Sequence, residues 1–214
     1  MNMHVPAPVV VKSVYDNQLD ILDAIVALHA PQGFECDLTY GNGAFWERQK
    51  RPQFCYDVDP QARWVETNCS TEIQHDESTL GNTVFDPPFL TYVRSGRGGN
   101  GRMIMSRRFG GYWTYQELED HYRKTLAEAA RVMRSGAVLV FKCQDIVHNH
   151  RLHSTHSNVI NWAEECGFRL KDSFVLVANH RLPSPNRKGT QKHARIFHSY
   201  FLVLERRPRP KPSK

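Results

Sequence analysis

The sequence predicts a doubly wound α/β domain with about seven strands, mostly parallel, an antiparallel last strand, and helices on both faces of the sheet. Two observations lead to this fold class. Short apolar segments alternate with segments of helical periodicity along most of the chain, which is the pattern of successive β–α units. The connection between the last two predicted strands is too short for a crossover helix, so these strands are expected to be antiparallel neighbours.

In the amino-terminal half, the expected elements alternate between helix and strand. The first helix covers residues 16–29, where apolar residues recur at helical spacing and Asp16 or Asn17 can cap the start. A short helix is expected at 44–49, after a glycine-containing turn. The strands of this half are expected at 34–40, 54–59, 71–74 and 83–85.

The carboxy-terminal half begins with the clearest helical pattern in the chain, residues 114–134. Thr114 and Glu117 form a capping box at its start, and a core-facing apolar stripe follows. Residues 137–141 are nearly all apolar, which predicts a strand that is buried on both faces. The remaining expected elements are a helix at 155–166 and strands at 174–178 and 200–204.

Glycine or acidic residues follow each of the first four predicted strands. These strands end, in order, at the turn Gly41-Asn42-Gly43, at Asp57 and Asp59, at Asp76, and at Asp86-Pro87-Pro88-Phe89. Glycine lets the backbone approach a ligand closely. Because ligands of open α/β sheets bind outside the carboxyl ends of the strands, all four features are expected at one edge of one sheet.

The tetrapeptide Asp86-Pro87-Pro88-Phe89 has unusual chemistry. Its two prolines remove two backbone N–H donors and stiffen the chain, which leaves carbonyl oxygens and a carboxylate facing outward beside an aromatic ring. Such a group can accept hydrogen bonds from an amino group while the ring stacks on a flat heterocycle. The same residues also suit an ordinary turn, so the upstream features decide between the two interpretations.

Taken together, these segments resemble class I S-adenosylmethionine-dependent amino-methyltransferases, which have a Rossmann-like sheet. The resemblance covers roughly residues 14–205. The segment 37–43 is similar to the family's first motif, 56–60 to its acidic second motif, and 86–89 to its catalytic motif. The resemblance implies S-adenosyl-L-methionine as the cofactor and an exocyclic amino nitrogen of a nucleic-acid base as the methyl acceptor.

The resemblance also implies roles for individual residues. The catalytic residues would be Asp86, Pro87, Pro88 and Phe89, with the carboxylate and the Pro87 carbonyl holding the amino hydrogens and the ring stacking on the base. Asp57, or alternatively Asp59, would bind the ribose hydroxyls, and Asp76 the adenine of the cofactor. The cofactor-binding set is Asp37, Thr39, Gly41, Gly43, Asp57, Asp59 and Asp76.

The aspartate at the first position of the catalytic motif favours adenine N6 in DNA as the acceptor, by resemblance. Cytosine and guanine stay open, as do an RNA substrate such as ribosomal RNA and a non-catalytic nucleic-acid-binding relative. Sequence-specific members of the family carry a separate target-recognition domain, whereas little of this chain is left once the sheet is built. Recognition then has to come from the loops, from a partner chain or dimer, or be short and relaxed.

Basic residues gather in segments that follow predicted strands, namely 90–113 and 181–198, and a His-rich loop at 144–153 is expected beside them. The net charge of +6 and the pI near 9.1 are compatible with nucleic acid. The predicted nucleic-acid-binding residues are Arg94, Arg97, Arg102, Arg107, Arg108, Lys142, Arg187, Lys188, Lys192 and Arg195. The histidines of the 144–156 region match no standard zinc spacing, so no metal is expected.

Length and composition indicate one methyltransferase domain over residues 1–205, followed by a basic, proline-rich flexible tail at 206–214. The five cysteines are scattered, which indicates reduced thiols. There is no apolar run long enough for a membrane span and no signal-peptide pattern, so an intracellular, cytoplasmic location is expected.

Overall fold

The computed structural model describes residues 10–92, 111–178 and 191–208. Its centre is an eight-stranded sheet with the strand order β1-β9-β10-β6-β5-β2-β3-β4. The strands are β1 (Val14–Tyr15), β2 (Cys36–Asp37), β3 (Phe54–Asp57), β4 (Glu66–Thr67), β5 (Thr83–Phe85), β6 (Val138–Cys143), β9 (Phe168–Val177) and β10 (His198–Arg206). The helices are α1 (Gln18–His29), the short 3-10 helix η1 (Ala44–Trp46), α3 (Tyr115–Val132) and α4 (Thr155–Glu165).

The sheet is parallel except at β10. This strand lies between β6 and β9 and is antiparallel to both, whereas the other pairs in the sheet are parallel. The expected antiparallel finish is therefore confirmed. The eighth strand, β1, was not expected: its two residues pair with Val175 and Leu176 at the outer edge of β9.

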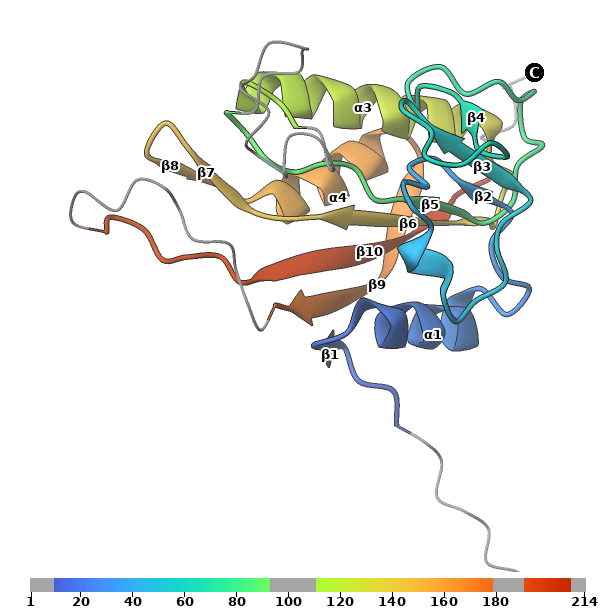
Figure 1. Ribbon diagram of the computed structural model, residues 1–214, viewed down its shortest axis with the longest axis horizontal. Helices are drawn as coiled ribbons and strands as arrows, with labels where there is room; N and C mark the ends of the chain where they lie inside the picture. Colours follow the sequence, from blue (N-terminus) through green and yellow to red (C-terminus); the bar gives the residue numbers. More distant parts are fainter. Residues whose placement is uncertain (1–9, 93–110, 179–190, 209–214) are drawn as a thin grey trace, which may run out of the picture.

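Helices cover both faces of the sheet, as predicted. In Figure 1, α3 and α4 lie on one face and α1 lies on the other. The strand β6 separates the two cores: Leu139, Phe141 and Cys143 pack with α3 and α4, while Val138 and Val140 pack with α1. All six residues of β6 are buried, because both faces of this central strand are covered.

The starts of the two long helices were correctly predicted. The Asn17 side chain accepts a hydrogen bond from the backbone N–H of Leu19 and caps α1. At α3, the Thr114 hydroxyl accepts from the backbone N–H of Glu117 at 3.1 Å. The Glu117 carboxylate reaches back one residue further than a standard capping box requires, to the N–H of Trp113.

Three expected elements were wrong. Residues 71–74 form turns, and the strand beside β3 is β4, at 66–67. This edge strand has two exposed polar residues, so it shows no apolar pattern. The helix expected at 44–49 is the three-residue η1. The expected loop at 144–153 contains the hairpin of β7 (Ile146–His148) and β8 (Arg151–His153), shown projecting from the end of β6 in Figure 1.

Arg206 belongs to the domain and not to the expected tail at 206–214. It is the last residue of β10 and is buried. Its guanidinium donates hydrogen bonds to the carbonyl oxygens of Ala130, Gly167 and Arg207 at 2.9–3.0 Å. These bonds link α3, the end of α4 and the last strand. Residues 209–214 of the expected tail lie outside the described part of the chain.

None of the helices among the described residues is long and apolar enough to span a membrane. The cytoplasmic location stays a prediction from the sequence.

Replacement of Arg206 by methionine should lower the free energy of unfolding by about 1–3 kcal/mol, because buried carbonyl groups would lose their donors. Arg207→Met is the matched control: this neighbour is exposed, and its loss should cost less than about 0.5 kcal/mol. Urea denaturation of the two variants checks this. Equal, small losses would show that Arg206 belongs to the tail.

Candidate functional site

The carboxyl ends of β2, β3, β5 and β6 lie side by side, because these strands are parallel neighbours. They bring Asp37, Asp57, Asp86 and Lys142 to one edge of the sheet. Backbone hydrogen bonds hold this edge together beyond the strands: Leu38 donates to Val84, and Tyr40 donates to Tyr56. The gathering of the glycine turn, the acidic residues and the Asp-Pro-Pro-Phe motif at one edge is as the sequence predicted, except for Asp76.

The turn after β2 needs glycine at two positions. Gly41 and Gly43 have φ angles of 56° and 79°, in the left-handed region. The N–H of Gly41 donates to the Asp57 carboxylate at 2.8 Å. At Gly43, an added Cβ would lie 2.6 Å from the Tyr40 hydroxyl, so the turn is wrapped closely around the Tyr40 ring.

Asp37 is the buried centre of the site, with 2% of its surface exposed. Its carboxylate accepts hydrogen bonds from the backbone N–H of Thr39 at 2.8 Å and from the indole N–H of Trp46 at 2.7 Å. Burial raises its pKa from the ordinary value of 3.8 to about 7. The two hydrogen bonds oppose this rise, and the carboxylates of Asp86 and Asp57 add to it.

Thr39 connects this centre to the proposed catalytic motif. Its hydroxyl accepts a hydrogen bond from the backbone N–H of Asp86 at 2.7 Å and lies 3.5 Å from the Asp37 carboxylate. Thr39 was predicted to contact the cofactor. The structure shows its backbone N–H and its hydroxyl engaged within the protein, where they connect Asp37 to the start of the motif, and its contact with the cofactor stays a prediction.

A buried residue of α3 holds the Asp-Pro-Pro-Phe motif in place. The Pro88 carbonyl accepts a hydrogen bond from the hydroxyl of Tyr122, a fully buried residue of α3, at 2.9 Å. Burial raises the pKa of Tyr122 far above its ordinary value, so this hydroxyl stays a donor. The Asp86 side chain is 27% exposed, and Phe89 is half-buried. The carboxylate and the ring therefore remain accessible at the end of β5.

The two predicted ribose ligands lie at the end of β3 and two residues past it, and they differ in their surroundings. The Asp57 carboxylate accepts from the N–H groups of Gly41 and Asp59, at 2.8 and 2.9 Å, and braces the turn. Asp59 is exposed. The choice between them stays as open as in the sequence.

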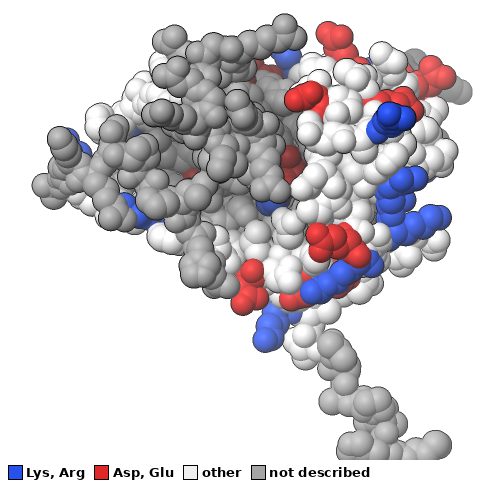
Figure 2. Space-filling view, viewed as in Figure 1, with Lys and Arg blue, Asp and Glu red and all other residues white. Residues whose placement is uncertain are grey.

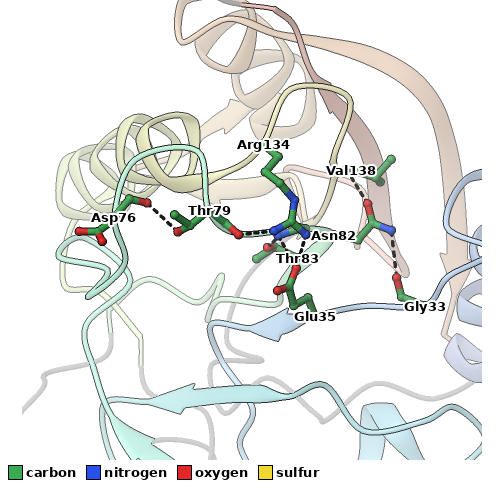
Figure 3. A network of polar contacts seen from close by, with 9 residues as sticks. Gly33, Glu35, Asp76, Thr79, Asn82, Thr83, Arg134 and Val138 are labelled. Atoms are coloured by element: carbon green, nitrogen blue, oxygen red, sulfur yellow. Dashed lines mark hydrogen bonds and ion pairs between the residues drawn. The ribbon is translucent and has the colours of Figure 1, made fainter.

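Asp76 does not reach this edge. It lies in a turn before β5, where its carbonyl accepts a hydrogen bond from the Thr79 hydroxyl. Figure 3 shows this turn connected to Arg134, whose guanidinium donates hydrogen bonds to the Thr79 carbonyl and the Glu35 carboxylate. Arg134 follows α3 and precedes β6, so the network marks the amino ends of the strands. The strand before Asp76 was placed wrongly, so Asp76 lies away from the edge that holds the other predicted cofactor residues.

Asn68 lies at the carboxyl edge of the sheet, directly after the edge strand β4, which is the position that the sequence predicted for Asp76. It follows β4, and its N–H donates to the Asp57 carbonyl at 3.1 Å. Asn68 is only 7% exposed, and its side-chain oxygen has no hydrogen-bond partner within the described structure. A buried acceptor without a donor is rare in folded proteins. Only the fold reveals it, because an asparagine after a polar two-residue strand has no signature in the sequence.

The predicted nucleic-acid contacts divide into three groups. Lys192 and Arg195 are exposed. Lys142 is buried, and its ammonium lies 2.8 Å from the Asp86 carboxylate. Figure 2 shows that Lys and Arg side chains and Asp and Glu side chains are both present among the described residues of this face. The remaining predicted contacts lie outside the described residues: Arg94, Arg97, Arg102, Arg107, Arg108, Arg187 and Lys188.

Within the described ranges, no three His, Cys, Asp or Glu side chains are grouped so that they could hold a metal ion.

Solved structures of similar fold are methyltransferases. A Galdieria sulphuraria protein named as a sarcosine dimethylglycine methyltransferase is 13% identical, with a TM-score of 0.52 over 88% of this chain and 84% of that one. The Burkholderia thailandensis 1,6-didemethyltoxoflavin-N1-methyltransferase, solved with bound 1,6-didemethyltoxoflavin and S-adenosylhomocysteine, is 14% identical, with a TM-score of 0.51 over 90% of this chain and 80% of that one. At these identities the likeness shows the fold alone: this chain has the Rossmann-like fold of methyltransferases.

A Thermus thermophilus protein named as a DNA modification methylase is also similar, at 15% identity and a TM-score of 0.45 over 69% of this chain. The match spans 55% of that protein, so this chain corresponds to about half of its length. No family and no curated protein matches the sequence.

Replacement of Gly43 by alanine should destabilise the protein more than the same change at Gly136. Both glycines have a φ near 80°, which costs a non-glycine residue about 1–2 kcal/mol. Only at Gly43 does the new methyl group also meet a ring, that of buried Tyr40, whereas nothing lies within 4 Å at Gly136. Urea denaturation measures both losses, and equal losses would contradict the close packing of the turn.

The elevated pKa of Asp37 should make stability fall with rising pH. Because the folded-state pKa of about 7 lies above the ordinary 3.8, the folded protein holds the extra proton between these values. The contribution of this group is present below about pH 4 and is lost as the pH rises through 7, by up to roughly 4 kcal/mol.

The difference in urea midpoint between Asp37→Asn and the wild type should therefore change between pH 5 and pH 8, with the variant gaining relative stability at the higher pH. Asp59→Asn, at an exposed position of the same edge, is the control and should keep the wild-type slope. If the urea midpoints of Asp37→Asn and the wild type changed with pH in parallel, the raised pKa of Asp37 would be refuted.

Proposed function

We propose that this protein is an S-adenosyl-L-methionine-dependent methyltransferase that methylates an exocyclic amino nitrogen of a nucleic-acid base, adenine N6 in DNA. One observation carries the proposal. The Asp86 motif and the glycine turn belong to one hydrogen-bonded unit, joined through Thr39. A cofactor seated on the turn and an acceptor at Asp86 would then be neighbours, as group transfer requires.

Three features of the edge fit the cofactor. The left-handed turn at Gly41 and Gly43 lets the backbone approach a ligand closely. Asp57 and Asp59 supply carboxylates for ribose hydroxyls at the end of the second parallel strand. The orphaned oxygen of Asn68, beside Asp57, would be satisfied by the amino group of an adenine ring. When bound, the cofactor supplies an electrophilic methyl group on a sulfonium.

The residues of the motif would then prepare the acceptor. The Asp86 carboxylate and the Pro87 carbonyl accept hydrogen bonds from the amino group of the base and draw its lone pair out of conjugation. Phe89 stacks on the base, and the Tyr122 hydroxyl keeps the Pro88 carbonyl, and with it the whole motif, in place. Catalysis is mainly orientation and electrostatics. A base in a duplex must leave the stack to reach this site.

Nucleic acid is the proposed partner for reasons of chemistry. A half-buried aromatic ring beside a carboxylate suits a flat base that carries an amino group. The exposed Lys192 and Arg195 are suited to phosphate contacts. DNA is favoured over RNA by the resemblance of the motif, and ribosomal RNA is the alternative. Recognition of a target sequence by a partner chain or a dimer stays part of the proposal.

Incubation with methyl-labelled cofactor and duplex DNA, single-stranded DNA or ribosomal RNA tests the function, and digestion to nucleosides identifies the modified base. Asp86→Ala should lower methyl transfer at least about 100-fold while cofactor binding persists, because the orienting acceptor is lost. Asp120→Ala, an exposed change on α3, is the control and should keep full activity. Label on N6-methyladenosine from RNA alone would select the alternative, and label on no nucleic acid would refute the proposal.

A further inference from the structure

We propose that Lys142 is a positioning residue for Asp86: its ammonium holds one oxygen of that carboxylate and leaves the other to the acceptor. The inference rests on the proposed function of Asp86. It assigns to Lys142 a role in the site itself, in place of the nucleic-acid contact that the sequence suggested.

The position of Lys142 is set by β6. Side chains alternate along this strand, so Lys142 lies on the same face as Val138 and Val140, toward α1 and η1. Its side chain is only 10% exposed. The ammonium nitrogen lies 2.8 Å from Oδ2 of Asp86 and 3.3 Å from the side-chain oxygen of Gln18, at the start of α1.

Two aromatic rings complete the enclosure. The ammonium lies 5.3 Å from the ring centroid of Phe201 and 5.7 Å from that of Phe45, and these two rings stack on each other. Ring faces attract a cation, and the effect is larger where water is excluded. Lysine is almost never buried without a partner. Every group around this ammonium therefore directs it to Asp86 and away from solvent, where a phosphate would be.

The charges around Asp86 explain why a cation is needed there. Asp37 faces it from β2, Tyr122 from α3 and Lys142 from β6, and Gln18 contributes a neutral amide. The mutual repulsion of Asp37 and Asp86 contributes to the raised pKa of Asp37. Without Lys142, the Asp86 carboxylate would face Asp37 in an enclosed site with no cation beside it, and both enclosure and a nearby negative charge favour the neutral form of a carboxyl group.

A protonated Asp86 could not serve in the same way, because a neutral carboxyl is a weaker acceptor and carries a donor of its own. The ammonium of Lys142 therefore places a positive charge beside the acceptor, and its bond to Oδ2 orients the carboxylate. A buried ion pair contributes little to stability compared with apolar residues of the same volume. This favours retention of the pair for its effect on the carboxylate.

The test compares Lys142→Met, which keeps the length of the side chain and removes its charge, with Lys142→Arg, which keeps the charge. In the methionine variant, the acid limb of the rate–pH profile should move up by about 1–3 pH units, so that activity is lost at pH 6 and largely recovered at pH 9. The KM for nucleic acid and the affinity for the cofactor should not change. The arginine variant should restore the wild-type profile.

Other roles for Lys142 predict other results. A phosphate contact would raise the KM for nucleic acid and lower the salt dependence of binding by about one unit of slope, without a shift of the acid limb. A purely structural role would lower the rate equally at every pH. Either result overturns the inference.

A readout without turnover separates this inference from the proposed function. In the substrate-free protein at pH 7, the carboxyl ¹³C resonance of Asp86 should move toward the protonated position in Lys142→Met and return in Lys142→Arg. An unchanged resonance overturns the role of Lys142 even if the enzyme is active. A shifted resonance in a protein that methylates nothing would refute the function and keep the ion pair.

Discussion

The buried carboxylate of Asp37 orders the whole carboxyl edge of the sheet. It accepts hydrogen bonds from the backbone N–H of Thr39 and from the indole N–H of Trp46, so it fixes both the turn after β2 and the short helix η1. The Thr39 hydroxyl in turn accepts a hydrogen bond from the backbone N–H of Asp86, which connects the end of β5 to Asp37. Burial raises the pKa of Asp37, and the two hydrogen bonds oppose that rise. Such bonds to a carboxylate are strong where water is excluded.

The same enclosure brings charges of both signs together at the ends of three neighbouring strands. Asp37, Asp86 and Lys142 lie on one face of the sheet, under the aromatic residues of η1 and β10. Two acids and one lysine in such a site influence one another strongly, because little solvent lies between them. The geometry makes Asp86 a partly exposed acceptor whose charge is balanced by a buried cation, which is a suitable arrangement for orienting a neutral amino group.

The errors of the sequence-based prediction share a physical origin. The strand after Asp59 was expected at 71–74, which is itself short and polar, whereas the true strand β4 is a two-residue polar edge held by its pairing with β3. That error placed Asp76 at the carboxyl edge in the prediction, although the structure has it near the amino ends of the strands. The hairpin of β7 and β8 was missed because its turn residues, Asn149 and His150, adopt positive φ angles without glycine.

The sequence alone determined the order of elements, the antiparallel last strand and the edge at which the motifs meet, because hydrophobic periodicity and strand direction are local properties. It also located the glycine turn and the Asp-Pro-Pro-Phe motif, because the properties that matter there belong to the residue types themselves. Tertiary structure alone decided the surroundings of Thr39, Asn68 and Lys142, because these depend on burial and on which strands are neighbours. In the sequence, Lys142 directly follows the predicted strand at 137–141. Its burial and its partner Asp86 appear only once β5 and β6 lie side by side.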